Sequence, residues 1–257
     1  MIASPRIMRL MAGVLAVVGG ATILFAQGRG GNSQPQKPVD LHDLSGYWEL
    51  SFDSERIPPA DLAPGVTKEV LAAEQKKTDK AIQWCNQLGM PFLMGVSRPL
   101  DIRQGRREIV ISPESTVAAA RHLYLDRSEH PNADIWDPSA NGDSIAHWEG
   151  DALVVDTTGF NPDHGMTLIP GGGYRSADAH LVEHYKLVSN GNVLDITFTW
   201  IDPKVYKTPH TYEFRYYKQS DKYEPRPAIG CNAFDAERVK FLGGTLISPI
   251  TGKPLTQ

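Results

Sequence analysis

The chain has 257 residues with 26 basic and 30 acidic side chains, a net charge of -4, and 41% hydrophobic residues. These values are ordinary for a globular protein. A nucleic-acid-binding protein usually carries a basic excess or a basic stripe, and this chain has neither, so we expect no nucleic-acid partner. Nothing in the composition predicts an oligomeric state.

The first 26 residues have the pattern of a secretory signal peptide. Arg6 and Arg9 form a basic start, an uncharged apolar run follows from Leu10 to Ala26, and the small residue Ala26 precedes Gln27. We therefore expect cleavage before Gln27 and an exported protein, periplasmic or extracellular, with no membrane association after cleavage. The alternative is an uncleaved anchor, because the run is close to the length that spans a bilayer.

The rest of the chain is interpreted as one domain with flexible ends. Residues 27–40 are rich in Gly, Gln and Pro, which is typical of a linker, and residues 243–257 form a Gly- and Pro-containing tail. The domain is expected over residues 41–242. Its cysteines, Cys85 and Cys231, are predicted to form a disulfide because an exported protein meets an oxidising compartment, and two buried free thiols are the alternative.

Hydrophobic alternation predicts a mainly β, antiparallel domain with one helix near its start. Thr67 is predicted to cap a helix that runs to about Asn86. Hairpins are expected around Glu149-Gly150-Asp151 and around Asn190-Gly191, since Asn-Gly is a strong tight-turn signal. Strands are predicted at residues 47–52, 109–111, 121–126, 144–148, 152–157, 181–188, 193–201 and 211–218. Strands of this length joined by hairpins favour a barrel or a strongly curved sheet.

The segment Gly46-Tyr47-Trp48 lies on the first predicted strand of the domain. It resembles the Gly-x-Trp motif that opens lipocalin-like barrels, in which the Trp closes one end. The resemblance implies a lipocalin-like barrel with Trp48 buried at one end of it.

A second match rests on longer stretches, of which Trp148-Glu149-Gly150-Asp151-Ala152-Leu153-Val154-Val155-Asp156-Thr157-Thr158-Gly159-Phe160-Asn161 is the most specific. The other matching pieces are Cys85 with Gly89-Met90-Pro91, Arg121 to Pro131, Ser176 to His184, and Asp202 to Tyr206. Together they make the chain similar to an uncharacterised family of secreted bacterial proteins, which implies kinship without a known activity. His147 and His184 stand where Arg or Lys is expected in relatives, which argues against a His-based role for these two.

Candidate site residues are the histidines, carboxylates and one phenol of the predicted strands: His122, His180, Tyr124, Asp126, Asp156 and Glu183. Two His with neighbouring carboxylates supply proton donors and acceptors near neutral pH. We therefore expect a pocket lined from the strands that carry His122 and His180, of use either for catalysis or for ligand binding.

Each candidate has a structural alternative. The side chains at positions 122, 124 and 126 share a strand face that an antiparallel sheet normally turns to solvent. For Asp156 a turn-forming role at the strand end is favoured over a carboxylate with a raised pKa in a cavity. His180 and Glu183 point to opposite faces of their strand, so only one of them faces inward. His130, in a polar loop before Pro131, is interpreted as a surface residue, and the alternative is that its side chain swings over the mouth of the pocket.

Several established motifs are excluded. Residues 180–184 spell H-x-x-E-H, the inverted zinc-protease pattern, but in a strand the two His lie about 13 Å apart, too far for one metal. The chain has no Gly-x-Ser-x-Gly, and Gly171-Gly172-Gly173 lacks the setting of a phosphate loop. No metal or other cofactor is predicted.

Two functions remain open. The first is a barrel that binds a small molecule in its mouth without turnover. The second is an exported lyase, isomerase or hydrolase that uses His and carboxylate groups for general acid–base chemistry. In either case the partner is a small-molecule ligand or substrate, and the long polar loops after Asp126 and after Phe160 are suited to forming a lid.

Overall fold

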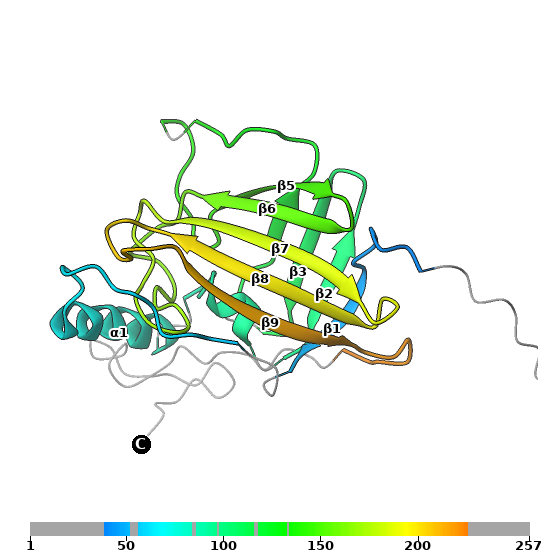
Figure 1. The fold of residues 1–257 in the computed structure, drawn as a ribbon, viewed down its shortest axis with the longest axis horizontal. Coiled ribbons are helices and arrows are strands. Elements are labelled where there is room, and N and C mark those ends of the chain that lie inside the picture. Colours follow the sequence, from blue (N-terminus) through cyan, green and yellow to red (C-terminus); the bar gives the residue numbers. More distant parts are fainter. Residues whose placement is uncertain are drawn as a thin grey trace, which may run out of the picture. The chain divides into compact units, whose positions relative to one another are not determined.

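The computed structural model describes residues 39–51, 56–83, 86–96, 98–115, 118–132 and 134–225 (Figure 1). The predicted signal peptide, most of the predicted linker, both cysteines and the predicted C-terminal tail lie outside these residues, so the predictions made for them stay predictions. Nine strands in the described part follow one another around a closed barrel, and the last pairs with the first. The strands are β1 (Gly46–Leu50), β2 (Leu100–Gln104), β3 (Glu108–Pro113), β4 (Arg121–Tyr124), β5 (Asp143–Glu149), β6 (Ala152–Thr158), β7 (His180–Val188), β8 (Val193–Ile201) and β9 (His210–Lys218).

The barrel confirms the predicted mainly β fold, with one departure from an antiparallel order. All neighbouring strands pair antiparallel except β4 and β5, which are parallel, with Leu123 opposite Ser144. A parallel pair needs a crossover connection of a dozen residues or more, and residues 125–142 supply one. This long connection crosses the outside of the wall instead of turning back as a hairpin, and no local signal in the sequence indicated it.

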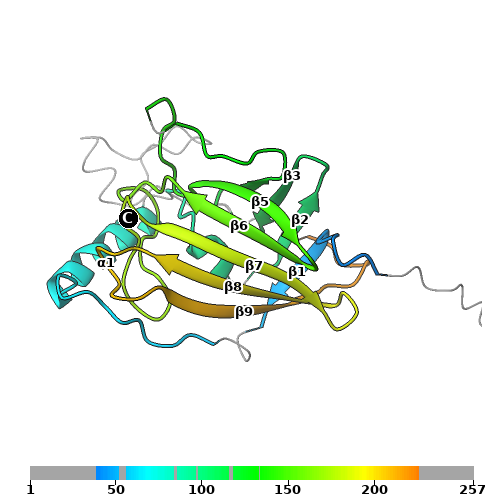
Figure 2. The same ribbon diagram turned by 45° about the horizontal axis from the view of Figure 1, so that its top comes forward.

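Two predicted hairpins form where expected. Gly150 adopts a positive φ of 59° between β5 and β6, and Ser189, Asn190 and Gly191 adopt positive φ angles between β7 and β8. Left-handed backbone at these positions matches the twist of tight hairpins. The strands β5 to β9 therefore run side by side along one half of the barrel wall, as both ribbon views show (Figures 1 and 2).

One α-helix, α1 (Lys68–Gln83), lies at one end of the barrel (Figures 1 and 2). As predicted, Thr67 caps it by accepting a hydrogen bond from the Val70 amide at 3.4 Å. The buried face of the helix includes a charged residue, because Glu74 is buried and accepts from the Thr167 hydroxyl at 2.6 Å, whereas Ile82 is half exposed. No helix in the described ranges is long and apolar enough to cross a bilayer.

Large side chains fill the inside of the barrel. The alternation of the strands turns aromatic and aliphatic residues inward, and Trp48, Trp200, Tyr185, Tyr212, Tyr216 and Phe198 are all fully buried. The indole N–H of Trp48 donates to the Leu44 carbonyl at 2.9 Å, so its polar atom is satisfied in the core. The burial expected for Trp48 is confirmed.

Candidate functional site

Two adjacent cavities lie on the outer side of the barrel wall, where residues 125–132 and 134–142 cross it. One has a volume of about 250 Å³ and the other about 530 Å³. Both are lined by Trp136 and Asp143, so we treat them together as the outer groove. Small-molecule sites usually measure about 300–1,000 Å³, which makes the outer groove the right size for one.

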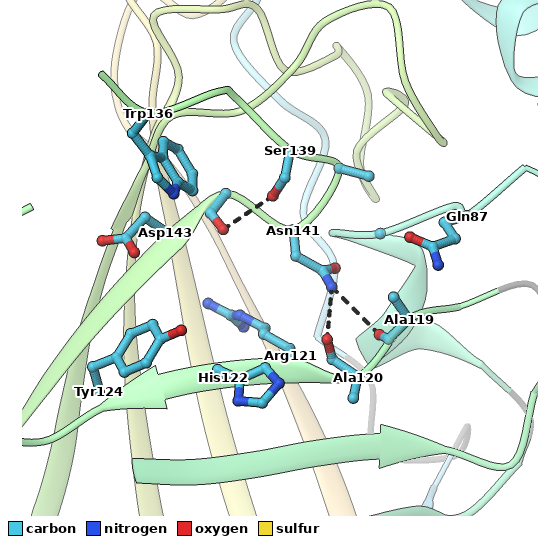
Figure 3. Close-up of a pocket in the computed structure, with 13 residues that line it drawn as sticks. Gln87, Ala119, Ala120, Arg121, His122, Tyr124, Trp136, Ser139, Asn141 and Asp143 are labelled. Carbon is cyan, nitrogen blue, oxygen red and sulfur yellow. Dashed lines mark hydrogen bonds between the residues drawn. The ribbon is translucent and has the colours of Figure 1, made fainter. Parts of the chain in front are cut away.

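The smaller cavity lies between strand β4 and the end of the crossover loop (Figure 3). His122 and Tyr124 contribute to it from β4, and Trp136 and Asn141 contribute from the loop. The Asn141 side-chain amide fixes the loop by donating to the Ala119 and Ala120 carbonyls at 3.3 Å. The Tyr124 hydroxyl points into the space between strand and loop, and it has no hydrogen-bond partner among the described residues (Figure 3).

The larger cavity lies between the first part of the crossover loop and the segment after β6. Its wall is largely apolar, with Trp136, Phe160 and the three prolines Pro131, Pro138 and Pro162, and its polar groups come from Thr158, Asn161, Asp163, His130 and Asp143. A short parallel bridge pairs Ser139 with Phe160 and joins the two segments. Gly159 is required here, because a Cβ atom at this position would lie 2.4 Å from Cζ3 of Trp136.

A continuous series of side chains, which we call the His–Asp chain, borders this groove. Arg127 donates to Asp143 at 2.7 Å, and Nδ1 of His130 lies 2.8 Å from the other oxygen of Asp143. Nε2 of His130 lies 2.9 Å from Asp156, whose second oxygen lies 2.7 Å from Nε2 of His180. The chain thus connects the crossover loop to β5, β6 and β7.

The environment of Asp156 stabilises its ionised form. Partial burial alone would raise the pKa of Asp156, but the hydrogen bonds and charges of His130 and His180 outweigh burial and bring the pKa below its ordinary value. The sequence had favoured a turn-forming Asp156 over a cavity carboxylate with a raised pKa. Neither interpretation describes it, because Asp156 is an ionised link between two histidines.

A buried arginine holds the segments behind the groove. Arg175 donates to the carbonyls of Met90, Asn161 and His164 at 2.7–2.8 Å, and its guanidinium lies over the Phe160 ring. Burial lowers the pKa of Arg175 to about 10, against the opposing charge of Glu74. Since Arg175 binds backbone groups of separate segments, it fixes their relative positions.

The structure does not bring the predicted site residues into one pocket. His122 and His180 both lie on the outer wall, but on β4 and β7, which are separated by β5 and β6. His122 is exposed with Nδ1 2.8 Å from Glu108, and Asp126 forms an ion pair with Arg107 at 2.5 Å. Of the six candidates, His122 and Tyr124 line the smaller cavity, where their rings are stacked with centroids 6.2 Å apart. His180 and Asp156 contact each other separately, on β7 and β6.

Glu183 belongs to the interior of the barrel. Its side chain is fully buried in an ion pair with Arg121, whose Nη1 donates to Oε1 of Glu183 at 2.9 Å, and the Tyr185 hydroxyl donates to the same oxygen. Ser144 and Thr157 accept further bonds from the guanidinium. Burial alone would lower the pKa of Arg121, but the charge of Glu183 raises it above its ordinary value. Glu183 therefore has a structural environment and no access to a ligand.

Sequence reasoning missed four members of the site: Arg127, His130, Trp136 and Asp143. His130 had been interpreted as a surface residue, yet only 23% of its side chain is exposed and both ring nitrogens are engaged. Three of the four lie on the crossover loop, and the parallel pairing that positions the loop has no local signal. Among the described residues, no group of three or more His, Cys, Asp or Glu side chains has a metal-binding arrangement.

The chain was compared with family models and with curated proteins. No family model matches the chain, and no curated protein matches it.

Proposed function

We propose that this protein binds an uncharged, hydroxyl-bearing small molecule in the outer groove. The observation that carries the proposal is a cavity of about 530 Å³ with an aromatic and proline-rich wall, next to a smaller polar cavity that shares Trp136 with it. An apolar lining with a few placed polar groups is the usual composition of a ligand site.

The groove is a better site than the mouth of the barrel. The sequence suggested a ligand within a lipocalin-like mouth, but Trp48, Trp200 and Tyr212 occupy the interior and are almost completely buried. A ligand there would have to displace close-packed side chains, which costs several kcal/mol in a typical core. The outer groove needs no such displacement.

The charges in the wall favour a neutral ligand. Asp143 pairs with Arg127 and His130, and Arg121 pairs with Glu183, so these charges are already compensated within the protein. The polar groups without a partner among the described residues are neutral, and they include the hydroxyls of Tyr124 and Thr158 and the indole N–H of Trp136. Such groups match hydroxyls, whereas a charged ligand would lose hydration without gaining a counter-charge.

Three probes of similar shape test this proposal: benzyl alcohol, benzoate and benzylamine. Ligand-observed NMR should show binding of benzyl alcohol to the wild type and a loss of at least tenfold in affinity in Trp136→Ala. Ile135→Ala is the matched control, because Ile135 adjoins Trp136 in the loop but is 84% exposed. Binding that Trp136→Ala leaves unchanged, or no binding by any of the three probes, would contradict the groove as a ligand site.

A second function is favoured by one observation, the contact between His180 and Asp156. Nε2 of His180 lies 2.7 Å from Asp156, while its Nδ1 has no partner among the described residues. A carboxylate that orients a His with a free second nitrogen is the arrangement of a general base. We propose that, if there is turnover, Nδ1 of His180 accepts the proton of an attacking water.

Hydrolysis of p-nitrophenyl acetate tests this second function. Water would add to the ester carbonyl, His180 would take its proton, and p-nitrophenolate would leave as the C–O bond breaks. We expect His180→Gln to lower the rate at least tenfold and His147→Gln, a more exposed histidine paired with Glu149, to leave it unchanged. Equal rates in both variants and the wild type would exclude His180 as the base.

The expectations of export and kinship are kept as part of this proposal. Cleavage before Gln27 would release a protein whose N-terminal sequence begins at that residue, and recovery of Met1 from the exported protein would contradict it. Non-reducing mass spectrometry should find Cys85 and Cys231 joined, and two alkylatable thiols would contradict the disulfide. The motif from Trp148 to Asn161, which resembles a family of secreted bacterial proteins, contributes residues 158–161 to the wall of the larger cavity and also contains Asp156.

A further inference from the structure

We propose that His130 is a pH-operated latch, which holds the crossover loop closed over the outer groove while its ring is protonated and releases the loop when the ring loses a proton. The role of the latch in ligand binding rests on the proposed function of the groove. The latch itself is a property of the free protein. It is carried by the position of one imidazole ring between two carboxylates.

The His130 ring is attached on both sides to strands of the barrel wall. Nδ1 lies 2.8 Å from Oδ1 of Asp143, and Nε2 lies 2.9 Å from Oδ1 of Asp156. Asp143 is the first residue of β5 and Asp156 lies within β6, so one side chain of the loop is bound to two neighbouring strands. The ring is partly exposed, which gives solvent protons access to it.

The hydrogen-bonding capacity of imidazole makes this attachment depend on charge. An ionised carboxylate only accepts hydrogen bonds, so both nitrogens must donate for both contacts to be attractive. Imidazolium has two N–H groups, whereas neutral imidazole has one and turns a lone pair toward the other carboxylate. Loss of one proton therefore replaces one of the two attachments with a repulsive contact.

The other charged and titratable groups near the His130 ring lie on the crossover loop and on the segments packed against it. The second oxygen of Asp143 accepts from Arg127, and the second oxygen of Asp156 lies 2.7 Å from Nε2 of His180. Glu129 precedes His130 in the loop and is exposed, and Asp163 lines the same cavity. Apart from the two histidines, Arg127 is the one basic side chain that contacts either carboxylate in the described part of the chain, so a protonated His130 ring supplies a positive charge between them.

Release of the ring would move one part of the loop and leave the other in place. Toward β5, Ser139 donates to the Gly159 carbonyl at 3.2 Å and accepts from the Asn161 amide at 2.9 Å, which holds the end of the loop independently of His130. Trp136 lies between these bonds and the latch, and its ring is a wall of both cavities. We therefore expect opening to displace Trp136 and widen the groove as pH rises.

NMR of the free protein tests the latch. Nitrogen-15 spectra report protonation of the His130 ring, and the indole N–H resonance of Trp136, assigned with Trp136→Phe, reports the loop. In the wild type we expect both to change with the same midpoint. His130→Gln should hold the Trp136 resonance at its high-pH position at every pH, whereas His147→Gln, the control, should keep the wild-type transition.

Different midpoints for the two signals would overturn the latch, as would a Trp136 transition that survives in His130→Gln. If His130→Gln does not fold, the comparison of the His130 and Trp136 midpoints in the wild type tests the latch by itself. His130→Arg, which is permanently charged, should then show the low-pH resonance of Trp136 at every pH. Because no ligand is added, the latch is tested separately from binding. Benzyl alcohol that binds neither at low nor at high pH contradicts the proposed function and leaves the NMR result on the latch standing.

Discussion

Replacement of Glu183 by Gln is the sharpest test of whether this residue has a structural or a functional role. Glu183→Gln keeps the shape of the side chain but removes the negative charge that compensates Arg121. The two side chains are 0% and 1% exposed, so the guanidinium would be left as an uncompensated buried charge. Breaking a buried pair from one side costs about 3–5 kcal/mol, which lowers the melting temperature of a domain of this size by roughly 6–20 °C.

Urea and thermal unfolding followed by circular dichroism measure this loss, and a surface pair provides the control. Asp195 accepts two hydrogen bonds from Arg215 at 2.6 and 2.7 Å, but both side chains are more than a third exposed. Asp195→Asn should therefore lower the free energy of unfolding by less than about 1 kcal/mol. A double variant with Arg121→Met and Glu183→Leu should recover most of the stability. If Glu183→Gln is as stable as Asp195→Asn, the buried ion pair does not have the energetic role inferred from its burial.

Three further outcomes follow from particular contacts. The pKa of Asp156 in the folded protein lies below the unfolded value near 3.8, so its ionised form stabilises the fold above about pH 4, and this stabilisation is lost as pH falls through the lowered pKa. The unfolding free energies of the wild type and of Asp156→Asn should therefore converge between pH 4 and pH 2. A constant difference over that range would refute the link between the lowered pKa and stability. Gly159→Ala should lower the unfolding free energy by about 1–3 kcal/mol and shift the Trp136 indole resonance. The control Gly150→Ala, also at positive φ but facing open space, should lower it by about 1–2 kcal/mol and leave that resonance in place. An indole resonance that is the same in both variants would exclude the steric contact between position 159 and Trp136. Trp48→Ala should lower the unfolding free energy by about 3–5 kcal/mol in urea titrations, and an unchanged midpoint would show that its burial contributes little.

The sequence predicted those parts of the fold that depend on local signals. Period-two alternation and turn residues located the strands from β5 to β9 and both hairpins, because each hairpin's pairing is set by a few adjacent residues. Strand β2 was not predicted, because it has only two large apolar residues, Leu100 and Ile102. Its other three residues are polar: Asp101, Arg103 and Gln104. Two apolar positions are too short a pattern to separate a strand from a loop.

The site was predicted in part for the same reason. Asp156 pairs with Val182, which puts His180 on the same outer face two residues away, within diagonal reach across antiparallel strands. Their contact could therefore have been inferred from the alignment of β6 with β7. The position of His130 could not, because it depends on a crossover loop whose path is set by the parallel pairing of β4 with β5.

That parallel pair also bears on how the chain reaches its native state. The β4–β5 seam, the β1–β2 seam and the β1–β9 seam, where Trp48 lies opposite Lys218, join strands that no hairpin connects. Contacts between residues far apart in sequence carry a larger loop-closure entropy and slow folding. The antiparallel hairpins β5–β6 and β7–β8 can form early from local interactions, whereas the three seams require distant segments to meet. The rate at which the barrel assembles is thus expected to be set by closure of these seams, and the loop that shapes the outer groove acquires its structure only when the β4–β5 seam has formed.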